Sequence, residues 1–179
     1  LRRMKETIAD ADILIASEKP QPIMQAFVKL PQVSRVLSQG ETKSSVITAD
    51  GFQVDLRVVE PDSFGAAAHY FTGSKTHNVK IRTLAVKKGI KVNEYGIFKG
   101  KRKIASKTEE EVYQALGLQW MPPEMREDWG EIELALKHKI PTLVELKDIK
   151  GDLQMHTTWS DGRNSIEEMA EASRDCGYE

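Results

Sequence analysis

The sequence predicts an α+β protein in which a mixed or antiparallel sheet with helices is followed by a mainly helical region. Two apolar-alternating runs, SSVITA and FQVDLRVV, flank Asp50-Gly51, and Asp-Gly between such runs favours a tight hairpin turn. Helical spacing with cap residues then prevails between residues 63 and 117. The 40% hydrophobic share of the 179 residues is enough for a core.

Residues 1–62 are expected to form the sheet. The branched run DADILIA at residues 10–16 has the length and composition of a buried strand. A helix is expected over PIMQAFVKL, opened by Pro22 and closed before Pro31, because proline suits a first helical turn and cannot continue a helix. Residues 44–59 form the expected hairpin. Its second strand places on one face Phe52, Val54, Leu56 and Val58, and on the other Gln53, Asp55 and Arg57.

Residues 63–122 are expected to be mainly helical. SFGAAAHYF has helical spacing, and after the turn FTGS we expect Ser74 to cap a helix that ends near Lys87. A two-stranded piece, IKVNEYGIF and RKIAS, is expected around Lys99-Gly100-Lys101. Thr108 and Glu111 then predict a capping box for a further helix.

The last third of the chain is expected to hold few elements. Residues 123–150 combine prolines and many acids with one amphipathic stretch, EIELALKHK, and are assigned to a linker. KDIKGDLQMHTTWSDG, at residues 147–162, resembles a strand with its loop. Ser165 and Glu168 predict a capping box for a final helix, SIEEMAEASRDCG.

The composition argues against several classes of protein. The longest apolar runs, ILIA and FGAAA, are far shorter than the ~20 residues of a membrane-spanning helix, so no membrane partner is expected. The single Cys176 excludes an intramolecular disulfide and suits the reducing cytoplasm. The opening LRRMKETIADAD has no initiator Met and no apolar signal segment, as we expect of a piece cut from a longer protein.

A net charge of -1 hides a strong asymmetry along the chain. Residues 69–107 carry eleven Lys or Arg and a single acid, Glu94, whereas residues 108–179 carry seven basic and seventeen acidic side chains. Lys and Arg that neutralise phosphates release counterions, so a polyanion is the expected partner of the basic segment. A solvated, lysine-rich face is the alternative.

Three aspartates suggest a metal site. Asp10 and Asp12 project to one face of the first strand, and Asp55 lies on the polar face of the hairpin. If these strands are neighbours, three carboxylates converge, and such oxygen ligands suit two Mg²⁺ or Mn²⁺ ions ~4 Å apart. Two-metal sites serve phosphoryl and nucleotidyl transfer. Alternatively, Asp10 and Asp12 cap a strand end and Asp55 pairs with Arg57.

The combination of segments is more specific than any single motif. RRMKETIADADILIA, FQVDLRVV and HYFTGSKTHNVKIRTLAVKKGIKVNEYGIF follow one another in the order of the palm and thumb of family X DNA polymerases, which residues 1–122 resemble. GDLQMHTTWSDG resembles the opening of the PHP phosphoesterase domain that follows the polymerase core in the bacterial and archaeal branch.

The resemblance implies roles for the residues of the palm and of the nucleotide pocket. Asp10, Asp12 and Asp55 match the three metal-binding, catalytic aspartates of the nucleotidyltransferase-type palm. Arg3 matches an arginine that contacts the incoming triphosphate, and a guanidinium fork suits phosphate oxygens. The turn YFTG, with Tyr70, Phe71 and Gly73, matches the turn that lines the sugar pocket.

Further roles follow for the helix after that turn. Asn78 and Arg82, one helical turn apart, match residues that reach the incoming base and the template strand. Lys75 and Lys80 belong to the basic segment that would hold DNA phosphates. Arg57 matches a residue that exchanges partners when the thumb closes.

Two positions depart from the family pattern. Ala9 stands where the family has Gly directly before the first aspartate. In the PHP segment the first metal motif, normally His-x-His, is Gln154-Met155-His156, so that only His156 is a possible PHP metal ligand. We therefore expect no phosphoesterase activity from this chain.

The resemblance implies a DNA-directed DNA polymerase that adds dNTPs to a primer 3′-hydroxyl in short-gap repair. Its expected partners are gapped or primer–template DNA and dNTP, and we expect a monomer. The domains are a palm at residues 1–62, a thumb at 63–122, a linker at 123–150 and the start of a PHP domain at 151–179. A template-independent nucleotidyltransferase and an inactive DNA-binding fragment are the alternatives.

Overall fold

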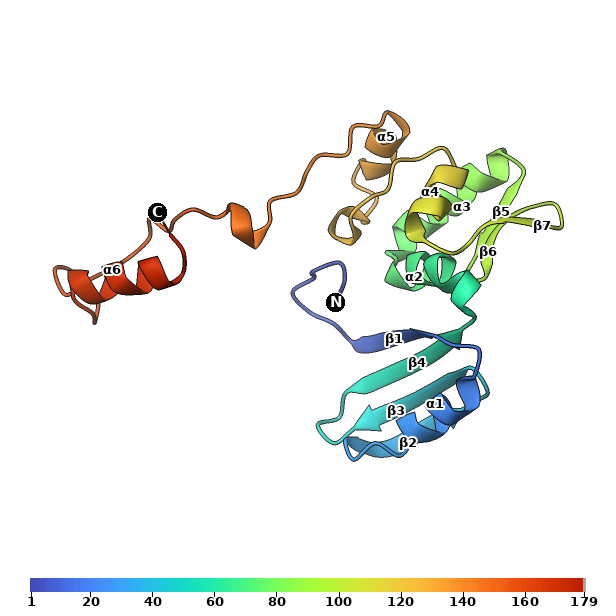
Figure 1. Cartoon of the computed structure of the whole chain (residues 1–179), viewed down its shortest axis with the longest axis horizontal. Helices are drawn as coiled ribbons and strands as arrows, with labels where there is room; N and C mark the ends of the chain where they lie inside the picture. Colours follow the sequence, from blue (N-terminus) through green and yellow to red (C-terminus); the bar gives the residue numbers. More distant parts are fainter. Residues whose placement is uncertain (179) are drawn as a thin grey trace. The chain divides into compact units, whose positions relative to one another are not determined.

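A computed structural model describes residues 1–178. They form two compact units, which are described separately: residues 1–140 and the residues from Pro141 onward. In the larger unit, a four-stranded sheet lies at one end, and most of the helices with a small second sheet lie at the other (Figure 1). This unit contains the candidate site.

The four-stranded sheet is mixed. Its strands are β1 (Asp10–Ala16), β2 (Val33–Gln39), β3 (Lys43–Thr48) and β4 (Gln53–Val59). They are ordered β1-β4-β3-β2, with β1 parallel to β4 and the other pairs antiparallel. The predicted first strand and hairpin are confirmed. Strand β2, to which the sequence analysis assigned no element, is an exposed edge strand in which Ser, Arg and Gln interrupt the apolar pattern.

One face of this sheet is covered by helix α1 (Pro20–Phe27). The helix begins two residues before the predicted Pro22, because Pro20 itself occupies the first turn. Met24 and Phe27 are buried against the apolar side chains of the hairpin. The polar side chains of β1 and β4 therefore lie on the opposite face of the sheet, away from this small core.

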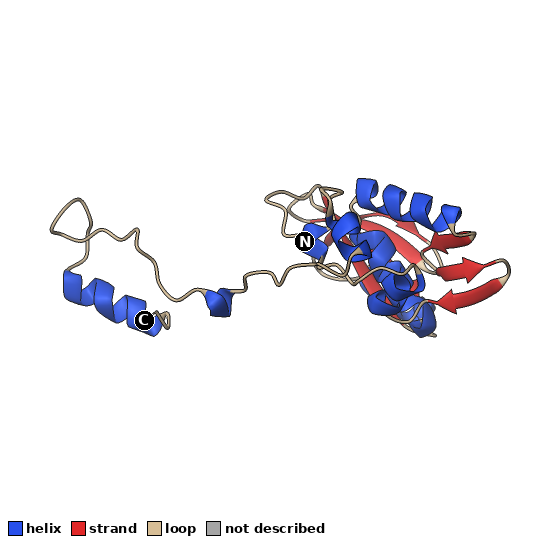
Figure 2. Cartoon of the chain, turned by 90° about the horizontal axis from the view of Figure 1, so that it is seen from above, coloured by secondary structure: helices blue, strands red, loops and turns tan. Residues whose placement is uncertain are grey.

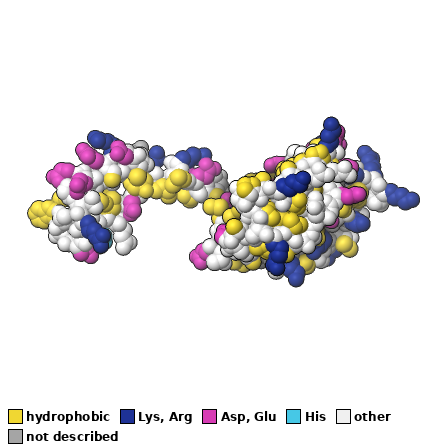
Figure 3. Space-filling model, turned by 90° about the horizontal axis from the view of Figure 1, so that it is seen from below, with side chains coloured by type: hydrophobic (Ala, Val, Ile, Leu, Met, Phe, Trp, Pro, Cys, Tyr) yellow, Lys and Arg dark blue, Asp and Glu magenta, His cyan; other side chains and the backbone are white. Residues whose placement is uncertain are grey.

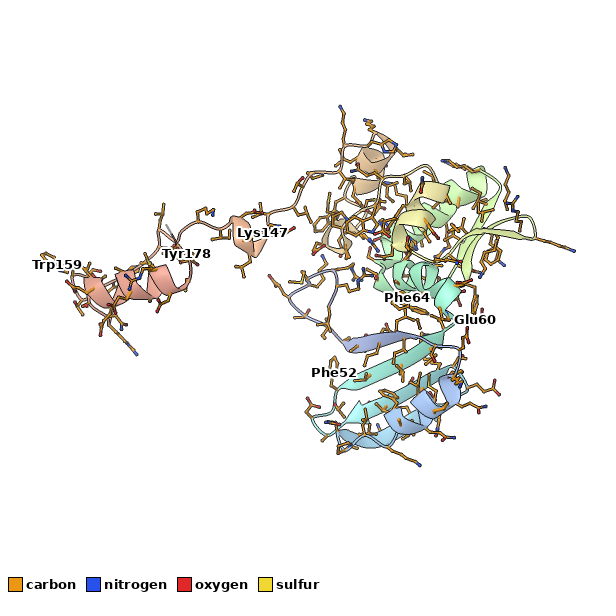
Figure 4. The ribbon with its side chains drawn as sticks, viewed as in Figure 1. Phe52, Glu60, Phe64, Lys147, Trp159 and Tyr178 are labelled. Atoms are coloured by element: carbon orange, nitrogen blue, oxygen red, sulfur yellow. The ribbon has the colours of Figure 1, made fainter. Side chains whose placement is uncertain are left out.

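The helices that follow match the sequence predictions. A short 3-10 helix, η1 (Pro61–Ser63), leads into α2 (Phe64–Thr72), then α3 (Lys75–Lys87) and α4 (Glu109–Ala115). The Ser74 hydroxyl accepts a hydrogen bond from His77 N at 3.3 Å, and the Thr108 hydroxyl accepts one from Glu111 N at 3.2 Å. Figure 4 shows Glu60 at the end of β4 and Phe64 at the start of α2, where the chain leaves the sheet.

The strand prediction for residues 90–105 was incomplete. Three antiparallel strands are present: β5 (Ile90–Asn93), β6 (Gly96–Lys99) and β7 (Arg102–Ala105). IKVNEYGIF is itself a hairpin, because Asn93 pairs with Gly96 across a two-residue turn and Asn93 Oδ1 accepts a hydrogen bond from Tyr95 N at 3.1 Å. The region predicted to be mainly helical thus carries a small sheet beside its helices, as Figure 2 shows.

The predicted linker at residues 123–150 was wrong for residues 123–140. These residues form η2 (Pro123–Met125) and α5 (Glu131–Leu136) within the larger unit. Ile132 and Ala135 join the main core, and Arg126 is fully buried. The apolar face of EIELALKHK is therefore covered by the helices rather than exposed along a linker. The core consists of Ala66, Ile81, Ala85, Ile90, Val92, Ile97, Val112, Tyr113, Leu116, Leu118, Met121, Ile132 and Ala135.

The unit from Pro141 onward contains η3 (Leu146–Asp148) and α6 (Ile166–Asp175). The capping box of Ser165 and Glu168 is confirmed. The strand predicted within residues 147–162 is not formed there; its place is taken by η3, turns and irregular backbone. No helix in residues 1–178 has the length and apolar character needed to cross a bilayer.

Candidate functional site

The three aspartates lie on neighbouring strands. In the parallel pair of β1 and β4, Asp12 is directly opposite Asp55, and Asp10 is opposite Gln53. Because side chains alternate along a strand, Asp10, Asp12 and Asp55 all point to the polar face of the sheet. Asp12 and Asp55 are therefore neighbours on this face, and Asp10 lies on the same side of β1.

The charges of these carboxylates act on one another. Burial, with the negative charges of Asp10 and Asp55, raises the pKa of Asp12 above its ordinary value. Burial also opposes ionisation of Asp55, but hydrogen bonds from Lys43, Gln53 and Ser45 outweigh it and lower its pKa. Negative charge therefore collects on this face, and a cation placed there would be stabilised.

The donor set fits hard divalent cations in its chemistry, since all three groups are carboxylates. The Asp55 carboxylate is held by the Lys43 ammonium at 2.9 Å and by Gln53 Nε2 at 3.0 Å. Within residues 1–178, no three His, Cys, Asp or Glu side chains stand in a ready metal-binding geometry. The Lys43 ammonium thus neutralises part of the negative charge of Asp55 in this structure.

A cavity of about 790 Å³ lies beside Asp10 and Asp12, and Asp55 is not part of its lining. It is bounded by the N-terminal segment, β1, α2 and the start of α4, and Arg3, Asp10 and Asp12 all line it. Phe71 and Thr72 line it from the end of α2. The predicted triphosphate ligand and two of the predicted metal ligands therefore share one cavity.

The end of α2 is a closely packed turn. The Arg57 guanidinium lies 4.4 Å from the ring centre of Phe71, and the Tyr70 ring packs edge-on against Phe71 at 5.1 Å. Asn78 Nδ2 donates to the Tyr70 carbonyl at 2.7 Å, while Asn78 Oδ1 is buried and unpartnered among the described residues. Asn78 thus supports the Tyr70–Gly73 turn from the next helix.

The basic residues of α3 differ in their availability. Lys75 is exposed and Arg82 is half-buried, and neither makes an ion pair within the described part of the chain. Lys80 is paired with Asp128 and with Glu133, both at 2.7 Å, and these bonds raise its pKa. Lys80, predicted to contact DNA, is therefore already neutralised in this fold. Figure 3 shows Lys and Arg side chains spread over the visible face of the larger unit rather than gathered in one patch.

Sequence reasoning missed a charged network at the wall of the cavity, which Arg2 and Glu109 both line. The buried Arg126 Nη1 is 2.6 Å from Glu109 Oε1, and Arg2 Nη2 is 2.8 Å from Glu109 Oε2. Burial opposes ionisation of Glu109, but these two arginines lower its pKa to about 2. Arg126 lies in the acidic run REDWGEIE, whose composition suggests a solvated surface, so nothing in the sequence indicated its burial.

His156, the remaining candidate from the PHP resemblance, is exposed. Its Nδ1 lies 2.6 Å from Asp161 Oδ1, in a turn closed by the bond from Gly162 N to the Thr157 carbonyl. No cluster of three metal-ligating side chains surrounds it among the described residues. His156 is thus a single exposed histidine paired with one carboxylate.

The comparisons with known proteins agree with this arrangement. A family model described as DNA polymerase beta thumb matches residues 67–127. The chain is 42% identical to the DNA polymerase/3′-5′ exonuclease PolX of Bacillus subtilis, in an alignment that covers all of this chain and 32% of that protein. This chain therefore spans about a third of the length of that relative.

More distant relatives extend the agreement. A repair DNA polymerase X of African swine fever virus is 28% identical over 70% of this chain and 77% of its own length. A crystal structure of Leishmania infantum polymerase beta, described as a ternary P/T complex, matches with a TM-score of 0.59 and 24% identity, over 70% of this chain and 64% of that one. The fold is thus the palm and thumb of a DNA polymerase. Within that class, the chain belongs to family X.

Proposed function

We propose that this chain carries the nucleotidyl-transfer site of a template-directed DNA polymerase that acts in short-gap repair. The observation that supports this most strongly is the parallel register of β1 and β4, which brings Asp12 beside Asp55. The adjoining cavity, lined also by Arg3, has room for a nucleotide. The named activities of the relatives in Bacillus subtilis and African swine fever virus agree with this function.

Each group in the site has a defined part in the proposal. Asp10, Asp12 and Asp55 would hold two Mg²⁺ or Mn²⁺ ions, which when bound supply charge neutralisation for the attacking hydroxyl and the leaving pyrophosphate. Arg3 offers guanidinium nitrogens to phosphate oxygens of the incoming dNTP. The Tyr70–Gly73 turn lies against the sugar, where the close backbone leaves little room for a 2′-hydroxyl.

The proposed DNA contacts lie on α3 and on the small sheet. Lys75 and Arg82 have no competing ion pair in residues 1–178, so they are available to phosphates and bases of a primer–template. Asn78, which supports the turn in this structure, would meet the minor-groove edge of the new base pair. Every correct base pair presents acceptors there, so such a contact tests the shape of the pair without selecting sequence.

Binding of Mn²⁺ tests the metal assignment directly. The change Asp55→Asn removes one carboxylate charge while conserving shape, and we expect the affinity for Mn²⁺ in calorimetry to fall at least about tenfold, or 1.4 kcal/mol. In an intact polymerase of this family that contains the same residues, Asp55→Asn should abolish primer extension on gapped DNA and leave DNA binding measurable.

The matched control is Asp50→Asn. Asp50 lies in the turn of the same hairpin, and Asn-Gly favours the same turn as Asp-Gly, so the fold is conserved. The control should bind Mn²⁺ like the unmodified chain. Equal Mn²⁺ affinity in both variants would show that Asp55 holds no metal.

A further inference from the structure

The guanidinium of Arg3 is held at two of its three nitrogens. Its Nε donates to Glu127 Oε1 at 2.8 Å, and its Nη1 donates to the Thr72 carbonyl at the end of α2. A Cβ built on Gly73 would lie 3.1 Å from the same Nη1, so this nitrogen packs directly against the turn. Within residues 1–178, Arg3 Nη2 makes no hydrogen bond or ion pair.

Glu127, the partner of Arg3, belongs to a segment whose backbone is held in place by neighbouring elements. The preceding residue, Arg126, is fully buried, and its carbonyl accepts a hydrogen bond from Ser74 N at 3.0 Å. The Arg126 guanidinium is bonded to Glu109, and the Glu127 carbonyl accepts from the Thr76 hydroxyl at 3.4 Å. Residues 126 and 127 are therefore anchored to both the start of α3 and the start of α4.

Arg3, in contrast, lies in a segment without helix or strand. Residues 1–9 contain only turns, bends and irregular backbone. A long, flexible side chain on such a segment loses conformational freedom when it binds an anion, and a partner that already fixes it reduces that cost. The contact with Glu127 has this effect on Arg3.

The local charge remains favourable for an anion. Lys5 Nζ lies 3.3 Å from the same Glu127 Oε1, so one carboxylate is shared by two cations. The Glu127 side chain is only 12% exposed, whereas those of Arg3 and Lys5 are 30% and 42% exposed. The group of three therefore presents net positive charge to solvent.

We propose that Glu127 is a positioning residue for the incoming nucleotide: it fixes Arg3 against the Thr72–Gly73 turn and leaves one guanidinium nitrogen for a phosphate oxygen. Because Arg3 lines the cavity that Asp10 and Asp12 also line, the phosphate so held lies beside the proposed metal site. This inference rests on the proposed function, since it assumes that Arg3 binds the triphosphate.

Equilibrium binding to the whole chain tests the inference, with Mg²⁺–dATP and inorganic tripolyphosphate as the two probes. We expect Arg3→Ala and Glu127→Ala each to weaken binding of both probes about tenfold or more, the range of a charge-assisted hydrogen bond. Glu127→Gln should weaken it less, because the amide oxygen still accepts from Arg3 Nε. If Glu127 acted only through its negative charge, its removal would strengthen binding of the anionic probes. Weaker binding by the Glu127 variants would therefore indicate that Glu127 positions Arg3.

The control is Glu124→Ala, which removes the same charge three residues away from an exposed side chain without an ion pair in the described part of the chain. It should bind both probes as the unmodified chain does or slightly more tightly. Binding of a labelled primer–template, followed by anisotropy, should be unchanged in Glu127→Ala. A parallel loss of DNA binding and of the melting temperature would indicate a general defect in the fold and would overturn the positioning role.

The outcomes separate this inference from the proposed function. If Arg3→Ala binds both probes normally, Arg3 is no phosphate ligand. The triphosphate-binding role of Arg3 and the positioning role of Glu127 then both fail. If Arg3→Ala weakens binding but Glu127→Ala and Glu127→Gln bind as tightly as the unmodified chain, or more tightly, only the positioning role of Glu127 is refuted.

Discussion

At the scale of single residues, the helical part of the larger unit buries several titratable side chains. His69 is 2% exposed, and neither of its ring nitrogens has a hydrogen-bond partner among the described residues. His77 lies between Glu131, with Nδ1 to Oε1 at 2.7 Å, and the Tyr113 hydroxyl, with Nε2 to Oη at 3.0 Å. The two histidines therefore have packing roles, but only His77 is held by polar partners.

The buried His69 should make the fold sensitive to mild acid. Burial, together with the positive charge of Arg126, lowers the pKa of His69 to about 3, whereas an unfolded chain has a His pKa of about 6.5. Below pH 6.5 the unfolded chain gains a proton that the folded chain does not, so stability is lost as the pH falls from about 6.5 towards 3. The greatest slope from one such group is about 1.4 kcal/mol per pH unit.

Urea unfolding at pH 7.5 and pH 5 measures this effect. The free energy of unfolding should be lower at pH 5, and His69→Leu, which cannot be protonated, should show a smaller decrease. Some dependence will persist, because burial also lowers the pKa of His77, although Glu131 opposes that shift. An equal decrease in both proteins would show that His69 is not the responsible group.

At the scale of elements, the contact between α2 and the start of α4 is unusually close. Gly65 N donates to the Lys107 carbonyl at 3.0 Å, and Ala66 N donates to the Ser106 carbonyl at 2.9 Å. A Cβ on Gly65 would lie 2.2 Å from the backbone carbonyl carbon of Thr108. A glycine inside α2 is therefore required by packing between backbones and not by local conformation.

The change Gly65→Ala should destabilise the fold by about 1–3 kcal/mol, the usual cost of overpacking, because the Thr108 backbone cannot give way as a flexible side chain could. This exceeds the roughly 0.5–1 kcal/mol that alanine gains over glycine in a helix. Chemical unfolding measures the difference. Gly151→Ala, where an added Cβ meets nothing within 4 Å, should be close to neutral. A Gly65→Ala variant as stable as the original would contradict the close packing.

At the scale of the whole molecule, residues 123–140 complete the helical part of the larger unit. Ile132 and Ala135 contribute to its core, and Arg126 neutralises Glu109. The 126–131 segment also reaches Arg3 and Lys80 through its acidic side chains. Part of the acidic charge after residue 108 therefore forms ion pairs inside the fold, with Arg3, Arg126 and, from the basic segment, Lys80.

Truncation distinguishes a linker from a part of the fold. A chain of residues 1–140 should melt within a few degrees of the whole chain's first transition. A chain of residues 1–122 should be destabilised by several kcal/mol, because removal of Arg126 leaves Glu109 without its buried partner, at about 3–5 kcal/mol, and opens the core. Circular dichroism melts measure both. Equal melting temperatures would restore the linker assignment.

Much of this architecture could be predicted from the sequence. The strand at Asp10–Ala16, the hairpin around Asp50-Gly51 and the helices capped by Ser74, Thr108 and Ser165 depend on local patterns. Strand β2 and the third strand of the small sheet were missed because their pairing partners, not their own composition, define them. Residues 123–140 were misassigned because prolines and acids suggest a linker until the surface that covers them is known.

The sequence by itself determined which residue types are available to the site: three aspartates on strands, the arginine Arg3 and a turn that contains Gly73. Only the tertiary structure decided that Asp12 lies opposite Asp55 and that Arg3 meets Glu127, 124 residues further along the chain. The physical reason is that local conformation depends on neighbours in sequence, whereas strand register and ion pairing depend on how distant segments pack.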